Sequence, residues 1–179
     1  MERINQIITN QKYLQYIEDI KKYEKDRKFC RHDVSHFLDV CRLAENEWLY
    51  VCITEMKNEH NGKVEYEKIP GSKIVNKEFL YAAGLLHDIG RWQQYESGIP
   101  HEIASAKLAP EILTESGFSA KETEEIVEAI RNHRNSDVKE HNNLSGFLYR
   151  ADKKSRPCFL CEVQKQCNWP VTKKNLEIR

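Results

Sequence analysis

The sequence lacks a net charge, a long apolar run and an apolar leader segment. Its 28 lysines and arginines balance 28 aspartates and glutamates, which argues against binding nucleic acid in bulk, because such binding needs a net basic surface. No run approaches the ~20 apolar residues of a membrane-spanning helix, so we expect no membrane partner. No apolar segment of a signal peptide follows residues 1–5, and we expect a cytoplasmic protein. Its six cysteines are then expected to be thiols or metal ligands rather than disulfides.

The spacing of apolar residues is typical of helices along most of the chain. We expect helices in these segments: 2–26 (two helices broken near residues 9–10), 33–56, 77–88, 100–116, 119–133 and 143–155. The strand signal is minimal, so the predicted fold class is all-α, a single helical bundle. A chain of 179 residues is long enough for one domain with a sizeable core.

Residues 57–76 interrupt the helical pattern with polar residues, glycine and proline. They indicate an inserted loop, in which residues 64–69 could form a short hairpin. A functional loop and a plain surface insertion are both open. We therefore expect a helical domain over 1–156 that contains this loop, and a cysteine-containing tail over 157–179 that packs on it.

The apolar run 79–86 ends in His87-Asp88, which places an imidazole beside a carboxylate at the end of a helix expected to be buried. Burying these two groups without partners would cost roughly several kcal/mol of folding free energy. A divalent metal bound to both is the simplest explanation for their expected burial. Helical periodicity turns His36 and Asp152 toward the same core. Two imidazoles and two carboxylates suit manganese, iron, cobalt, nickel or zinc better than calcium.

His101 and His133 also lie on apolar stripes of expected helices. A lone histidine on such a face is more often a hydrogen-bonded core residue than a ligand, so each is weak evidence when taken singly. The interpretation changes when six such groups occur on consecutive helices, because helical bundles build metal sites from inward-facing side chains. His32, His60 and His141 fall in turn or loop contexts and are interpreted as ordinary.

The ordered set resembles the HD-domain superfamily of metal-dependent phosphohydrolases, of the HDIG type with an H…HD…H…H…D pattern. The matching strings are HFLDV at 36–40, LLHDIGR at 85–91 and RADK at 150–153. HEIASA at 101–106 and AIRNH at 129–133 resemble the extra histidines of members that hold two metals. The resemblance covers about residues 30 to 155.

This resemblance implies one or two divalent transition metals, with Asp88 bridging where two are bound. The ligands it implies are His36, His87, Asp88 and Asp152 for one metal, and His101, His133 and Asp88 for the second. Metal-bound hydroxide, whose parent water has its pKa lowered to roughly 7 in good cases, would attack phosphorus. Asp88 would orient or deprotonate that water. The implied substrate is a small phosphorylated metabolite such as a nucleotide.

Basic residues near these motifs are candidates to hold the phosphates. Arg91 and Lys153 are the stronger candidates, whereas Arg134 is better explained as a surface cation. Many relatives have lysine where this chain has Arg91, which keeps the charge and adds a bidentate fork. We place Arg91 at the C-terminal end of helix 77–88, because Gly90 should stop that helix. The chain also lacks the Gly-Tyr-Pro segment of the cyclic-dinucleotide phosphodiesterase branch, so that substrate is disfavoured.

Cysteines cluster beyond the last expected helix. Cys158, Cys161 and Cys167 form a C-x2-C-x5-C pattern, and a C-x2-C pair is a usual half of a zinc or iron–sulfur site. Cys30 is a candidate fourth ligand and His32 is another. Reduced thiols that pack the tail are the alternative, because the second C-x2-C half is missing.

Two other functions fit the same residues. One is a mixed-valence di-iron oxygenase of the HD fold, which would consume oxygen and release no phosphate. The other is a non-catalytic metal-binding regulatory module, which would hold metal and hydrolyse no phosphoester.

Overall fold

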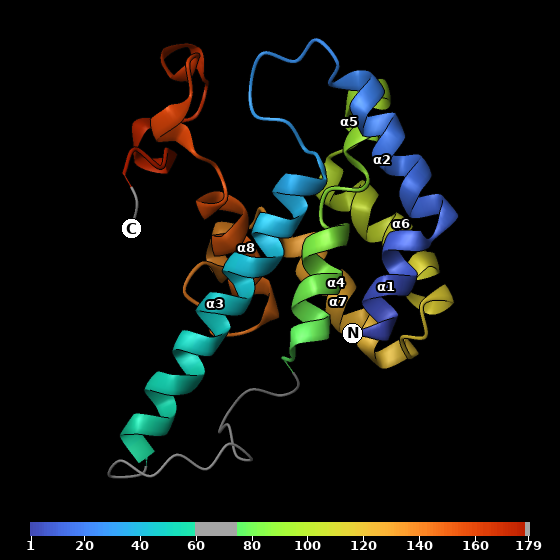
Figure 1. Ribbon diagram of the computed structural model, residues 1–179, viewed down its shortest axis with the longest axis vertical. Coiled ribbons are helices and arrows are strands. Elements are labelled where there is room, and N and C mark those ends of the chain that lie inside the picture. The colour runs from blue at the N-terminus through green and yellow to red at the C-terminus, as the bar shows by residue number, and fades with distance from the viewer. Residues whose placement is uncertain (60–74, 178–179) are drawn as a thin grey trace.

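The computed structural model describes residues 1–59 and 75–177, and within them the chain is helical with no strand (Figure 1). The all-α prediction is therefore confirmed. The α-helices are α1 (Glu2–Thr9), α2 (Gln11–Tyr23), α3 (Val34–Glu59), α4 (Lys77–Leu86), α5 (Arg91–Ser97), α6 (His101–Glu115), α7 (Ala120–Asn132) and α8 (Leu144–Lys154). No helix of this described part is long and apolar enough to cross a membrane.

Side-chain caps explain where several helices begin. The Asn10 side chain accepts hydrogen bonds from the backbone of Lys12 and Tyr13, so the chain breaks between α1 and α2 as predicted. Ser119 and Glu122 form a capping box at the start of α7, because each side chain bonds the other residue's backbone N–H. These short polar side chains satisfy backbone donors that the first helical turn leaves free.

Helix α3 is longer than the sequence indicates. It continues to Glu59, so residues 57–59, which are expected in the loop, are helical. No proline or glycine occurs in these three residues to end the helix. The rest of the expected loop up to residue 74, including the possible hairpin at 64–69, lies outside the described residues.

The prediction that Gly90 leaves Arg91 at a helix C-terminus is wrong. Helix α4 ends at Leu86, residues 87–90 form a turn, and Arg91 begins a new helix, α5. Gly90 has a φ of −87°, which any residue can adopt. Its role is steric instead, because a Cβ built there would lie 2.4 Å from the backbone nitrogen of Ser105 on α6.

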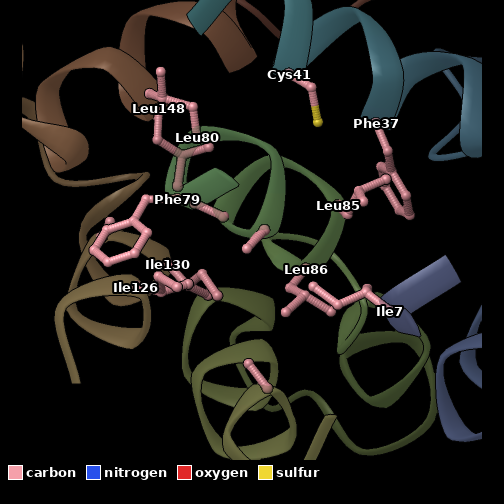
Figure 2. Packing of buried hydrophobic residues seen from close by; sticks show 14 of the residues in the cluster. Ile7, Phe37, Cys41, Phe79, Leu80, Leu85, Leu86, Ile126, Ile130 and Leu148 are labelled. Carbon is pink, nitrogen blue, oxygen red and sulfur yellow. The ribbon is translucent and has the colours of Figure 1, made fainter. Parts of the chain in front are cut away.

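Helix α4 lies at the centre of the core. Seven of its ten residues are buried, and it packs against α1, α3, α6, α7 and α8. Figure 2 shows its side chains directed toward Phe37 and Cys41 of α3, Ile126 of α7 and Leu148 of α8. Because α4 is surrounded in this way, the His87-Asp88 turn that follows it is held inside the protein.

The chain beyond α8 forms a tail with three short 3-10 turns: η2 (Cys158–Leu160), η3 (Gln164–Gln166) and η4 (Val171–Lys173). In Figure 1 the tail extends in orange and red from the end of α8. The Asn175 side chain donates to the backbone carbonyls of Lys153 at 2.7 Å and Arg156 at 2.9 Å. These bonds fix the last part of the tail to the end of α8.

Candidate metal centre

Six buried side chains from five parts of the fold meet around Asp88. His36 comes from α3, His87 and Asp88 from the turn after α4, His101 from the start of α6, His133 from the end of α7, and Asp152 from α8. All six are at most 7% exposed. The structure thus brings together every residue that the sequence nominates for the histidine–aspartate centre.

The two carboxylate oxygens of Asp88 face different histidines. Oδ1 lies 3.1 Å from His101 Nε2 and 3.7 Å from His133 Nε2. Oδ2 lies 3.4 Å from His87 Nε2 and 3.8 Å from His36 Nε2. Two groups of three residues therefore share Asp88, and within each group the possible ligand atoms lie within 4.8 Å of one another. One carboxylate with an oxygen on each side has the geometry of a bridging ligand.

Asp152 adds a second carboxylate on the side of His36 and His87. Its Oδ1 is 3.5 Å from His36 Nε2 and 3.8 Å from His87 Nε2. Its Oδ2 pairs with the Lys153 amino group at 2.5 Å. Asp152 can therefore join the group of His36, His87 and Asp88, while its other oxygen remains paired with a cation.

Hydrogen bonds to backbone carbonyls fix two of the imidazoles. The Nδ1 of His87 donates to the Gly84 carbonyl at 2.7 Å, and that of His133 donates to the Ile130 carbonyl at 2.6 Å. In these two residues the oxygen acceptor places the ring proton on Nδ1 and leaves the lone pair of Nε2 directed at Asp88. Metal-binding histidines are usually oriented in this way. The Nδ1 of His101 lies 2.5 Å from Gln94 Oε1 and 2.6 Å from Nη1 of Arg91, a guanidinium that can only donate, so these two contacts hold the ring in place without fixing its tautomer.

Two buried atoms of the cluster have no hydrogen-bond partner: His87 Nε2 and Asp88 Oδ1. Leaving such atoms unsatisfied costs about 1–3 kcal/mol each, and more for a charged group. A divalent cation on each side of Asp88 would satisfy both, one beside His87 Nε2 and one beside Asp88 Oδ1. The donor set of imidazole nitrogens and carboxylate oxygens also suits a first-row transition metal, so these residues fit a metal ion.

The protonation states of Asp88 and of three of the four histidines agree with this fit. Burial opposes ionisation of Asp88, but the surrounding imidazoles hold its pKa well below the ordinary value. Burial lowers the pKa of His36 and of His101 to about 2, and that of His133 to about 4. His87 differs, because Asp88 and Asp152 outweigh burial and raise its pKa. Neutral imidazoles beside an ionised carboxylate are the forms that bind metal.

Arg156 occupies a place that the sequence does not reveal. It is buried, and its Nη2 donates to His36 Nε2 at 2.9 Å and lies 3.5 Å from Asp152 Oδ1. A cation therefore already sits between one imidazole and one carboxylate. A metal held by His36 Nε2 would have to replace this hydrogen bond.

His32 is a residue beside the centre that sequence reasoning misses. Its sequence context indicates an ordinary residue or a partner of the cysteines, but it is buried and its Nε2 lies 3.7 Å from Asp88 Oδ2. Its Nδ1 bonds the Glu24 carboxylate at 2.5 Å, and Glu24 also accepts from the Tyr95 hydroxyl at 2.6 Å. His32 precedes α3, so helical periodicity gives no signal for its burial.

The centre opens into a cavity of about 540 Å³. Asp88, Asp152 and the two predicted phosphate-binding residues, Arg91 and Lys153, all line it. Arg134 lines it as well, but its guanidinium is half exposed and pairs with Glu102 at 3.3 Å. Arg91 and Lys153 therefore lie where an anionic ligand of the centre would bind.

The cysteines nominated for a second metal are less closely grouped. Cys30, Cys158 and Cys167 line the same cavity, and burial raises the pKa of Cys30, with a smaller contribution from Cys158 and Cys161. Among residues 1–59 and 75–177, no three of the four sulfurs lie within 4.8 Å of one another. A zinc or iron–sulfur site here stays a prediction.

The all-α bundle and its buried cluster define a helical protein able to bind a metal ion. The family model of the HD domain matches residues 36–156, and the chain belongs to the HD domain family, a superfamily typical of metal-dependent hydrolases. A protein of Clostridium beijerinckii, described as "Uncharacterized protein", is 39% identical over 178 residues, which is 99% of each chain. No solved structure matches.

Proposed function

We propose that this protein is a metal-dependent phosphohydrolase that cleaves a phosphoester or phosphoanhydride of a small phosphorylated metabolite, most simply a nucleotide. One observation carries the proposal: two potential metal-binding groups share Asp88 at a cavity that Arg91 and Lys153 also line. Membership of the HD domain family supports it independently.

The metal ligands would be Asp88 and the five residues around it. His36, His87, Asp88 and Asp152 would hold one ion, and His101 and His133 would hold a second through the other oxygen of Asp88. When bound, such ions would neutralise negative charge on the phosphoryl oxygens and lower the pKa of a bound water to roughly 7. Whether manganese, iron, cobalt, nickel or zinc is used is a matter for measurement.

The protein's own residues would bind and orient the phosphate. Arg91 offers a planar fork of donors that matches two phosphate oxygens. Lys153 offers a point charge beside Asp152. His32 directs its Nε2 toward Asp88, and Glu24 holds the His32 ring in place. His32 could therefore accept a proton from, or donate one to, a substrate bound in the cavity.

The test is phosphate release by the full chain after loading with each candidate metal. A panel of nucleotides is scored for phosphate and pyrophosphate, and the Asp88→Asn variant is compared with Asp39→Asn. Asp39 lies on α3 with an exposed side chain and serves as the matched control. We expect Asp88→Asn to lose turnover and Asp39→Asn to keep it.

Three results would contradict the proposal. Full activity of Asp88→Asn would remove the carboxylate from the mechanism. Oxygen consumption with iron and no phosphate release would indicate the di-iron oxygenase. Stable metal binding without hydrolysis of any phosphoester in the panel would indicate a regulatory module.

A further inference from the structure

The outer wall of the cavity comes from the C-terminal tail. Asn168, Trp169, Pro170 and Lys173 line the cavity together with the residues of the metal centre. Its volume of about 540 Å³ is within the range of pockets that enclose a small organic ligand, roughly 300–1,000 Å³. The cavity is therefore larger than a phosphate group needs, and the tail borders the additional space.

The tail is held in a fixed position relative to the centre. Asn175 bonds the carbonyls of Lys153 and Arg156, which directly follow Asp152 and the end of α8. The Lys174 amino group donates to the Gln164 carbonyl at 2.8 Å and ties the last part of the tail to η3. A wall anchored in this way can recognise a ligand without first having to become ordered.

The charges that line the cavity favour an anion. The only acids among its described lining residues are Asp88 and Asp152, which belong to the metal centre. The cations of the lining are Arg27, Arg91, Arg134, Lys153, Arg156 and Lys173. They range from buried Arg156 to exposed Lys173, so positive charge extends from the centre to the tail.

Aromatic side chains border the same space. Phe29, Tyr149 and Trp169 line the cavity. Trp169 is half-buried, and no other ring in the described part of the chain stacks on it. An indole can stack on any nucleobase, because every base has a flat aromatic face. The cations that line the cavity would then attract the negatively charged phosphate attached to that base.

We infer that the tail recognises the part of the substrate remote from the reacting phosphate, and that this part is a nucleobase stacked on Trp169. That the substrate carries a phosphate rests on the proposed function, whereas the nucleobase is inferred from the residues of the tail. The substrate class is accordingly a nucleotide rather than a sugar phosphate or an inorganic polyphosphate.

The test compares two ligands that differ only in the base. AMP and ribose 5-phosphate are titrated into the full-length protein by calorimetry, with a chelator present so that no turnover occurs. GMP and CMP are titrated in parallel to show whether any base suffices. We expect the protein to bind AMP about tenfold or more tightly than ribose 5-phosphate.

Variants of Trp169 identify the contact. Trp169→Ala and Trp169→Leu are expected to bind AMP as weakly as ribose 5-phosphate, and Trp169→Phe to keep most of the preference. Phe159→Ala is the matched control, because Phe159 is a tail aromatic that is 41% exposed and does not line the cavity. The leucine variant keeps an apolar side chain and so separates stacking from packing of the tail.

Equal binding of AMP and ribose 5-phosphate by the wild-type protein would overturn the inference. The same holds if Trp169→Leu keeps the preference, or if Phe159→Ala loses as much of it as the Trp169 variants. Phosphate release by the metal-loaded protein is measured separately. A base preference without release would contradict the proposed function alone, and release from both ligands with equal affinities would overturn the inference alone.

Discussion

Gly90→Ala tests how closely α6 must approach the turn that carries His87 and Asp88. The added Cβ would lie 2.4 Å from the backbone nitrogen of Ser105 and 2.6 Å from the carbonyl carbon of Ala104. Ordinary contact begins at 3.4 Å, so the turn and α6 must separate by about 1 Å, which is far outside the roughly 0.2 Å tolerance of metal–ligand distances.

The separation should affect one metal group more than the other. His101 belongs to α6 and faces Asp88 Oδ1, whereas His36 and His87 come from α3 and the turn itself. We expect Gly90→Ala to lose affinity for an ion at the proposed site of His101 and His133 and to keep most of the affinity at the other group. Overpacking of this kind also costs about 1–3 kcal/mol of folding free energy.

Manganese binding measured by calorimetry, together with thermal unfolding, decides the outcome. Gly98→Ala is the matched control, because its φ of 76° makes alanine strained by about 1–2 kcal/mol while no atom lies within 4 Å of the new Cβ. We expect Gly90→Ala and Gly98→Ala to lose similar amounts of folding free energy. Only Gly90→Ala should also bind less manganese. A Gly90→Ala variant that binds manganese like the wild type would refute the steric argument.

Three further predictions concern the surroundings of the centre. Arg91→Ala should raise KM for a phosphorylated substrate about tenfold or more, since a hydrogen bond to a charged group is worth about 1.5–3 kcal/mol; steady-state kinetics with an unchanged KM would argue against phosphate binding by Arg91. Burial raises the pKa of Glu24, but bonds to His32 and Tyr95 lower it from 4.5 to about 2. The stability that Glu24 contributes is then present above pH 4.5 and lost as the pH falls toward 2. Glu24→Gln should therefore be less stable near neutral pH by about 1.5–3 kcal/mol, the contribution of a hydrogen bond to a charged group, and denaturant unfolding should show the difference shrinking in acid; a difference independent of pH would be inconsistent with it. Cys158→Ser should remove zinc or iron from the tail and leave manganese binding unchanged, as metal analysis can check; an unchanged zinc and iron content would exclude a cysteine site.

Helical periodicity in the sequence is enough to place the main candidate ligands in the core. His36 and Asp152 lie on buried stripes of α3 and α8, and the chain positions of His101 and His133 put them at the inward-facing ends of α6 and α7. A 3.6-residue repeat indicates which face of a helix is buried. It does not reveal how the helices meet, so the division of the ligands between the two oxygens of Asp88 is visible only in three dimensions.

The residues that the sequence hides lie where periodicity carries no information. His32 precedes the first residue of α3, and its burial depends on Glu24 and Tyr95, which are distant in the chain. Arg156 follows α8 and donates a hydrogen bond to His36, which lies 120 residues earlier in the sequence. Gly90 has the sequence signature of a helix stop. Its steric role is hidden in the sequence, because the close approach involves residues of another helix, α6.

Manganese titration of the wild-type chain and of Asp88→Ala tests the central claim most directly, because manganese favours nitrogen and oxygen donors over thiolates. If Asp88 serves both groups, the variant loses every manganese ion that the wild-type chain binds, while remaining folded by circular dichroism. A folded Asp88→Ala protein that binds manganese with wild-type stoichiometry and affinity would contradict the shared centre.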